Sequence, residues 1–348
     1  MAEQKTTQAL LTPEELEPAT SLARRVLEAM DTILLGQHEL HRMVLVGILS
    51  RGHILLEGMP GVGKTAMINA LGQLMSLQFQ RVQFTPDLMP GDIVGSSILR
   101  EEDGGKRQMV FEPGPIFTNI LLADEINRAS PKTQSAMLEA MQEHRVTTLG
   151  TTRDLPFPFF VLASQNPVDL EGTYPLPEAQ LDRFLFKLQV GQPGPGVLED
   201  ILTSRRRGQP PVPEAIVDPA GIELLFSAMD RIFLPRPVAS YIARLVSCTL
   251  PTDDAAPADF KTYVSYGASP RAAIAIGESA RANALIAGRP TAGFEDVRAV
   301  APAVLNHRII LNHQARFDNV DSLQLVARLL DAVDASGLDL PSGIEVSS

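Results

Sequence analysis

Residues 58–65 read Gly58-Met59-Pro60-Gly61-Val62-Gly63-Lys64-Thr65. This is the G-x-x-x-x-G-K-[ST] spacing of a loop that wraps nucleotide phosphates. Glycines let the loop turn tightly with its N–H groups aimed inward, and the helix that follows offers free amide donors. The Lys64 ammonium can reach the β- and γ-phosphates, and the Thr65 hydroxyl can coordinate Mg²⁺. We therefore predict that the chain binds a nucleoside triphosphate, ATP or GTP, with Mg²⁺.

Elements on both sides of this loop fit the prediction. Residues 53–57 read as a short buried strand and residues 66–71 as a helix, which is the order of elements that the loop requires. The residues that we expect to contact the nucleotide are Gly58, Pro60, Gly61, Val62, Gly63, Lys64, Thr65, Ala66 and, in a turn between two earlier helices, Gly36 and Gln37.

The order of elements along the chain predicts an α/β fold. Further apolar strands at 79–84, 120–123, 160–163 and 184–188 alternate with helical segments, which favours a parallel sheet flanked by helices. Two segments, 92–117 and 145–157, break the alternation and have the pattern of inserted β-hairpins. From residue 219 to 330 the pattern is helical. The expected domains are a tail (1–19), the α/β nucleotide-binding domain (20–191), a linker (192–215), an all-helical lid domain (216–335) and a second tail (336–348).

Composition limits the location and the partners. The chain has 348 residues, 45% of them hydrophobic, and its only cysteine is Cys248, which we expect to pack as a core residue. The polar start and the lack of a long apolar run predict a cytoplasmic protein without membrane insertion. A net charge of −11 argues against a surface that broadly coats nucleic acid.

Two carboxylates follow the strand at 120–123, namely Asp124 and Glu125. Asp124, at the strand tip beside the phosphate-binding loop, is expected to hold Mg²⁺ through water, together with Thr65. Glu125 is expected to orient and polarise the attacking water. The pair predicts hydrolysis of the nucleotide rather than binding alone.

Three further side chains are candidates for the catalytic site. Asn166 follows the next strand, where an amide can position the water, although an Asn-Pro pair also forms turns. Arg183 precedes the last strand and lies away from the chain's own loop in this topology, so it can complete a neighbour's site as an arginine finger; the alternative is a surface pair with Asp182. Arg271 lies in the first turn of a helix that begins at Ser269-Pro270, where a cation opposes the helix dipole, which favours a role toward a ligand.

Several longer motifs are similar to those of the MoxR family of AAA+ ATPases, and the resemblance covers residues 20–330. They are GMPGVGKT (58–65), FTPDLMPGDIVG (84–95), LLADEINRASPKTQSAMLEAMQE (121–143), ASQNP (163–167), PLPEAQLDRF (175–184) and GASPRAA (267–273). The resemblance implies a homo-oligomeric ring, a hexamer, with hairpin inserts at both places noted above. It also implies the same roles for Lys64, Thr65, Asp124, Glu125, Asn166, Arg183 and Arg271.

The resemblance further implies a chaperone that remodels or activates protein complexes, beside a partner with a von Willebrand factor A domain, and in some members insertion of a metal cofactor. A nucleic-acid motor would share both hairpins, but the mixed charge of 102–107 and the near-neutral 149–152 disfavour it. Glu125 and Arg183 argue against a nucleotide-dependent scaffold that does not hydrolyse the nucleotide. The sequence has no Asn-Lys-x-Asp run, which argues against a GTPase. A magnesium-chelatase-like motor subunit stays open as an alternative.

Overall fold

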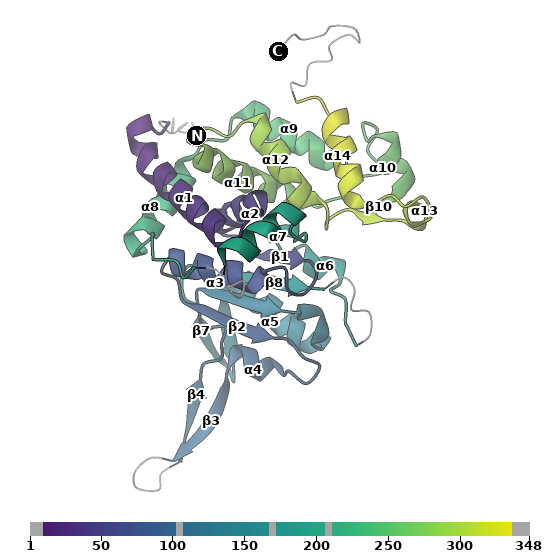
Figure 1. The fold of residues 1–348 in the computed structure, drawn as a ribbon. Helices are drawn as coiled ribbons and strands as arrows, with labels where there is room; N and C mark the ends of the chain where they lie inside the picture. Colours follow the sequence, from purple (N-terminus) through teal and green to yellow (C-terminus); the bar gives the residue numbers. More distant parts are fainter. Residues whose placement is uncertain (1–9, 102–106, 167–171, 206–210, 336–348) are drawn as a thin grey trace, which may run out of the picture. The chain divides into compact units, whose positions relative to one another are not determined.

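The computed structural model describes residues 10–101, 107–166, 172–205 and 211–335, and the chain forms two compact units that meet in sequence at Asp230 and Arg231. One unit is residues 13–230 and contains the central sheet (Figure 1). The other begins at Arg231 and includes the residues before Pro13. Residues 1–9 of the predicted tail at 1–19, and the whole predicted tail at 336–348, lie outside the described residues.

The sheet of the first unit is parallel throughout, and its strand order among the described residues is β2-β5-β8-β1-β9. The central strands β5, β8 and β1 are mostly apolar because helices cover both faces, as in other parallel sheets. The strand bounds are β1 (Ile54–Glu57), β2 (Phe79–Gln83), β5 (Ile120–Asp124), β8 (Phe160–Gln165) and β9 (Phe186–Gln189). The predicted parallel sheet flanked by helices is confirmed.

The helices of this unit flank the sheet (Figure 1). The predicted tail at 1–19 contains the start of the first helix, and the predicted linker at 192–215 contains a complete helix, α7. The elements are α1 (Pro13–Ile33), α2 (His38–Leu49), α3 (Lys64–Leu74), α4 (Pro90–Val94), the 3-10 turn η1 (Ile126–Arg128), α5 (Pro131–Glu143), α6 (Glu178–Leu181), α7 (Pro195–Ser204) and α8 (Pro219–Arg231).

Alternate residues of each central strand enter different cores. Leu55, Leu121 and Val161 pack with α5 residues such as Met137 and Leu138 on one face. On the other face α2 lies so close to β1 that a Cβ on Gly47 would come within 2.6 Å of the Ile54 side chain. Both faces of the central strands are therefore covered, and the polar residues of β1, β5 and β8 lie at the carboxyl ends of these strands.

A buried histidine ties α5 to this sheet. The His53 ring accepts a hydrogen bond from the Val161 amide at Nδ1 (3.0 Å), and Nε2 donates to the Met141 carbonyl at 3.0 Å near the end of α5. Burial lowers the pKa of His53 to about 4. The neutral ring thus satisfies one backbone donor and one backbone acceptor that the core would otherwise leave unpaired.

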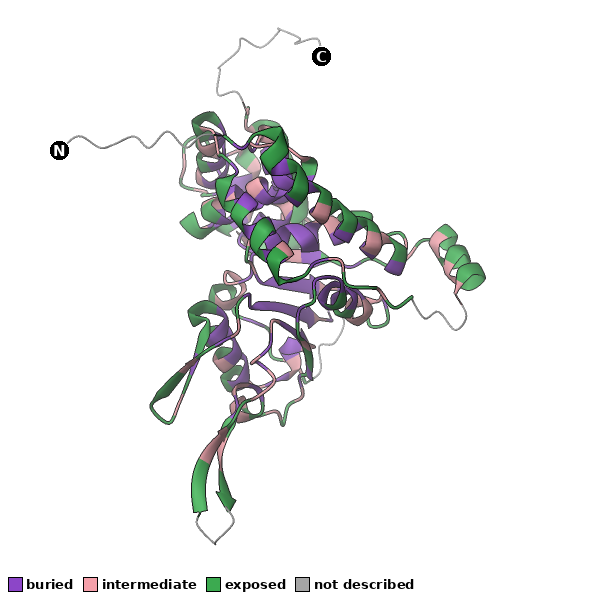
Figure 2. Ribbon diagram, turned by 90° about the vertical axis from the view of Figure 1, so that its left-hand side faces the viewer, coloured by how far each residue is buried: buried purple, intermediate pink, exposed green. Residues whose placement is uncertain are grey.

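The two predicted hairpins are confirmed in the described residues. Strands β3 (Ser96–Glu101) and β4 (Arg107–Glu112) pair in antiparallel fashion, as do β6 (Arg145–Thr148) and β7 (Thr151–Asp154). Figure 2 shows both hairpins as exposed arms. They touch where the Arg153 guanidinium lies 3.7 Å from the centre of the Phe111 ring. Residues 102–106 of the predicted first tip lie outside the described residues.

The second unit is a helical bundle with one short antiparallel strand pair, β10–β11, which the sequence reading did not anticipate. Its core includes a buried network in which Asn283 and Arg289 both bind Asp296. No helix in the described part of the chain is long and apolar enough to cross a bilayer. The elements are α9 (Arg236–Ser247), α10 (Ala258–Tyr263), β10 (Val264–Tyr266), α11 (Pro270–Ala287), α12 (Phe294–Leu305), β11 (Ile310–Leu311), α13 (His313–Phe317) and α14 (Ser322–Ala332).

Two glycines of α4 and its C-cap provide a matched test of the fold. Gly95 has φ +89°, and a Cβ there would lie 2.5 Å from the Glu112 carbonyl oxygen, whereas the nearest atom to a Cβ on Gly91 is 3.9 Å away. We expect Gly95→Ala to lower the free energy of unfolding by about 3 kcal/mol, since strain and overlap add. Gly91→Ala should be neutral or mildly stabilising in scanning calorimetry. Equal stability of the two variants would contradict the close packing of Gly95 against Glu112 beside the β3–β4 hairpin.

Candidate nucleotide-binding and catalytic site

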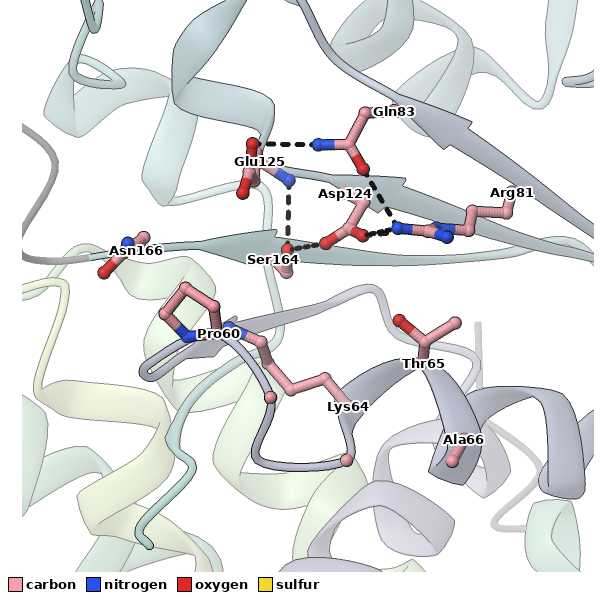
Figure 3. Close-up of a pocket in the computed structure, with 12 residues that line it drawn as sticks. Pro60, Lys64, Thr65, Ala66, Arg81, Gln83, Asp124, Glu125, Ser164 and Asn166 are labelled. Carbon is pink, nitrogen blue, oxygen red and sulfur yellow. Dashed lines mark hydrogen bonds and ion pairs between the residues drawn. The ribbon is translucent and has the colours of Figure 1, made fainter. Parts of the chain in front are cut away.

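A cavity of about 390 Å³ opens where β1, β5 and β8 end (Figure 3). The carboxyl ends of parallel strands share one edge of a sheet, so residues far apart in the sequence meet there. The cavity is lined by Pro60, Gly61, Gly63, Lys64, Thr65, Ala66, Arg81, Gln83, Asp124, Glu125, Ser164 and Asn166. Most of the predicted nucleotide and catalytic residues are thus brought together.

The phosphate-binding loop has the backbone that its glycines predict. Gly61 and Gly63 have φ values of +84° and +91°, and α3 begins immediately afterwards at Lys64. The free amides of the first turn of α3 therefore face the cavity beside the Lys64 side chain. In this structure the Lys64 ammonium donates to the Gly58 carbonyl at 2.6 Å. Burial lowers the pKa of Lys64, against the opposing effect of Asp124 and Glu125.

Both oxygens of Asp124 are engaged. Ser164 Oγ donates to Oδ1 at 2.5 Å, and Arg81 donates to Oδ2 from Nη2 at 2.6 Å and from Nε at 3.2 Å. A carboxylate next to the Thr65 hydroxyl fits Mg²⁺, a hard cation that takes oxygen ligands and keeps several waters. The described residues contain no group of three or more His, Cys, Asp or Glu that could hold a metal. Asp124 and Thr65 offer two oxygen ligands, so phosphate oxygens and water would complete the coordination of such a cation.

The backbone of Glu125 has a strained conformation. Its φ and ψ are 57° and 48°, in the left-handed region that side chains other than glycine rarely adopt. Its amide donates to Ser164 Oγ at 3.0 Å, while its Oε2 accepts from Gln83 Nε2 at 2.8 Å and pairs with Arg128 Nε at 3.2 Å. The turn directs the carboxylate into the cavity, beside Asn166 from the end of β8. Strain of this kind is typical of active sites.

A second, more apolar cavity of about 250 Å³ shares Gly61, Gly63 and Ala66 with the first. Predicted residues Gln37 and Val62 line it. Its apolar lining beside a phosphate-binding loop suits a nucleobase. Gly36 is not among the lining residues: it packs against α7, where a Cβ would come within 2.4 Å of Val197. The other lining residues are Ile33, Leu34, Leu35, Pro193, Leu198, Ile201 and Arg205.

Polar contacts fix the walls of this apolar cavity. Arg205 caps the end of α1 by donating to the carbonyls of Ile33 (2.6 Å) and Thr32 (2.7 Å). The carboxylate of Asp31 lies 2.6 Å from His38 Nδ1 and 2.7 Å from His41 Nδ1. The turn between α1 and α2 is therefore anchored on one side by α7 and on the other by two histidines.

The two predicted arginines are not among the residues that line either of these cavities. Arg183 lines a separate polar groove of about 410 Å³, where its Nη1 donates to the Leu138 carbonyl at 2.8 Å. Arg271 belongs to the second unit, in the first turn of α11, after Ser269 at the N-cap position. Their catalytic roles stay predictions. The other residues of the Arg183 groove are Ser135, Leu138, Glu139, Gln142, Glu143 and Gln180.

Sequence reasoning missed three polar residues that surround the carboxylates: Arg81, Gln83 and Ser164. Arg81 and Gln83 are two positions apart on β2, so they share a face of the strand beside β5. The two polar residues on one face of β2 were the pattern that could have pointed to them. That pattern places them at the site only once β2 is known to lie beside β5.

Residues 53–186 match the model of the ATPase family associated with various cellular activities (AAA), and residues 258–329 match the AAA lid domain. Chaperone MoxR1 of Mycobacterium tuberculosis is 42% identical over 90% of this chain and 82% of its own. Protein MoxR of Methylorubrum extorquens is 32% identical over 80% of this chain and 84% of its own. The crystal structure of a predicted ATPase from Cytophaga hutchinsonii matches with a TM-score of 0.84 and 37% identity, over 92% of this chain and 97% of that one. This chain belongs to the MoxR family of AAA+ ATPases.

Proposed function

We propose that this chain hydrolyses ATP with Mg²⁺ in the 390 Å³ cavity, as a ring of identical subunits, and uses the cycle to remodel a protein client. The proposal depends on one observation. A single cavity is lined by the phosphate-binding loop, by the Thr65 hydroxyl, and by the carboxylates of Asp124 and Glu125, which have different hydrogen-bond partners. Such a set supports phosphoryl transfer to water.

Each residue has a distinct part in this reaction. The loop amides and Lys64 would hold the phosphates, while Thr65 and Asp124 would hold Mg²⁺, which neutralises charge on the transferred group. Glu125 would accept a proton from the attacking water, and Asn166, beside it in the cavity, would orient that water. Glu125 is turned into the cavity by its left-handed backbone and is only 24% exposed, so its carboxylate stays close to where water would bind.

A neighbouring subunit would supply an arginine to this cavity. Arg183 lies outside the cavity within its own unit, on a groove formed by α5 and α6. An arginine that approaches the γ-phosphate from another subunit would make hydrolysis depend on ring assembly. A hexamer is the ring size that the family resemblance implies.

A protein client is favoured over nucleic acid by the described hairpin residues. The Arg107 side chain pairs with Glu101 at 3.6 Å, and Arg145 pairs with Glu143 at 3.0 Å. The tip of the β6–β7 hairpin is Leu149-Gly150, and Leu149 is 81% exposed. These surfaces offer apolar and paired groups rather than a basic track for phosphates.

The client itself is proposed from family likeness. The relative named Chaperone MoxR1 supports a chaperone-like role, and a partner with a von Willebrand factor A domain and metal-cofactor insertion stay proposals from the same resemblance. A magnesium-chelatase-like motor subunit remains the alternative, and a cytoplasmic location remains a prediction.

Glu125→Gln should separate binding from hydrolysis. The amide fills the same space but is a poor proton acceptor, so we expect ATP affinity within a few-fold of wild type and turnover lower by about 10²–10³-fold. Isothermal titration and a phosphate-release assay measure the two. Glu112→Gln, on the exposed strand β4, is the control and should behave as wild type. Turnover at the wild-type rate in Glu125→Gln would mean that another group accepts the proton from water.

Arg183→Ala should bind ATP yet hydrolyse it at least about 100-fold more slowly, because charge on the γ-phosphate is left unbalanced. Mixing it with Lys64→Ala protein should restore part of the activity, since the second chain's Arg183 can serve the first chain's intact loop. The matched control mixes Arg183→Ala with the double variant Lys64→Ala/Arg183→Ala, which supplies no arginine. Equal rates in both mixed rings would exclude action between subunits.

ATP turnover should respond to protein rather than to nucleic acid. We expect stimulation by casein as an unfolded probe, or by a von Willebrand factor A domain protein, and none by single- or double-stranded DNA or RNA at about 150 mM salt. Fluorescence anisotropy measures binding of each polymer in parallel. Tight DNA binding with strong stimulation would support the nucleic-acid motor instead.

A further inference from the structure

Arg81 occupies the place beside Asp124 where a divalent cation is expected. Its guanidinium gives two hydrogen bonds to a single oxygen, Asp124 Oδ2, at 2.6 and 3.2 Å. Figure 3 shows the side chain extended along the sheet edge toward the carboxylate. Because Ser164 donates to Oδ1, both oxygens of Asp124 already accept a hydrogen bond from a side chain.

The strand order explains how Arg81 reaches this position. Strand β2 pairs with β5 in parallel, with Gln83 opposite Asp124 and Arg81 opposite Leu122. Arg81 and Gln83 lie on one face, and the longer side chain spans the two-residue offset. Arg81 Nη2 also donates to Gln83 Oε1 at 3.0 Å, and Gln83 Nε2 donates to Glu125. One strand therefore holds both carboxylates.

The charges of the cavity make this contact significant. Two cations, Lys64 and Arg81, face two carboxylates, Asp124 and Glu125. Lys64 donates to the Gly58 carbonyl, while Arg81 makes the direct ion pair with Asp124. The Asp124 side chain is 14% exposed and that of Arg81 47%, so the pair is only partly screened by water.

An arginine ion pair and a divalent cation cannot share the same oxygen without strong repulsion. A guanidinium within hydrogen-bond distance of Oδ2 repels a divalent cation at that oxygen and competes with metal-bound water for its lone pairs. Displacement is feasible because the Arg81 side chain is nearly half exposed and can turn toward solvent or toward phosphate oxygens, which suit its planar donors.

We propose that Arg81 is a positioning residue that holds Asp124 in the nucleotide-free subunit and competes with Mg²⁺ for it. Binding of the nucleotide with its cation requires the guanidinium to leave, and loss of the cation after hydrolysis lets it return. Arg81 thereby lowers the affinity for Mg²⁺ and favours release of the product. This inference rests on the proposed function.

The test is a Mg²⁺ titration of metal-stripped protein saturated with a fluorescent ADP analogue, which reports cation binding without turnover. We expect Arg81→Gln to lower the Mg²⁺ concentration at half-saturation by about tenfold. This is the size of effect that loss of a partly exposed, charge-assisted ion pair would have. Arg100→Gln makes the same change of charge on the exposed strand β3 and should leave the value within twofold of wild type.

Unchanged or weaker Mg²⁺ binding in Arg81→Gln would overturn the inference. An equal gain in Arg100→Gln would also overturn it, because net charge rather than the Asp124 pair would then set the affinity. Failure of the wild-type protein to bind the ADP analogue with or without Mg²⁺ would be a distinct result. It would refute the proposed function, and this inference with it.

Discussion

The geometry of the candidate site depends on the Ser164 hydroxyl of β8. It donates to Asp124 Oδ1 and accepts from the Glu125 amide, so one side chain fixes both the Asp124 carboxylate and the strained turn at Glu125. This is possible because β8 lies between β5 and β1 in the parallel sheet. The phosphate-binding loop at the end of β1 is thereby set opposite the two carboxylates at the end of β5.

Helix α5 connects this edge to the other functional regions. It follows η1, the turn directly after Glu125, and it leads into the β6–β7 hairpin. Its Leu138 carbonyl accepts the hydrogen bond from Arg183, and its Met141 carbonyl accepts the one from His53. Arg153 then joins the β6–β7 hairpin to the β3–β4 hairpin through Phe111. Glu125, Arg183 and the β6–β7 hairpin are thus all joined to α5, and the β3–β4 hairpin is joined to it through Arg153.

Local patterns allowed most of the fold and the core of the site to be predicted. The loop at 58–65 and the Asp-Glu pair after β5 are contiguous signals, and the hairpins show as interruptions of the alternating pattern. The contacts of Arg81, Gln83 and Ser164 depend on which strands are neighbours, which no local pattern specifies. Helix α7 was mistaken for part of a linker because its flanking prolines and glycines dominate the composition. Gly36 was expected at the nucleotide but packs against that helix.

The most direct test of the central claim is a structure of the assembled Glu125→Gln protein with ATP and Mg²⁺, in which hydrolysis is blocked. The account predicts the triphosphate against Lys64 and Thr65, and the Arg183 guanidinium of an adjacent subunit at the γ-phosphate. A triphosphate bound away from this loop would contradict the account. So would a filled site in which every Arg183 still binds the Leu138 carbonyl of its own chain.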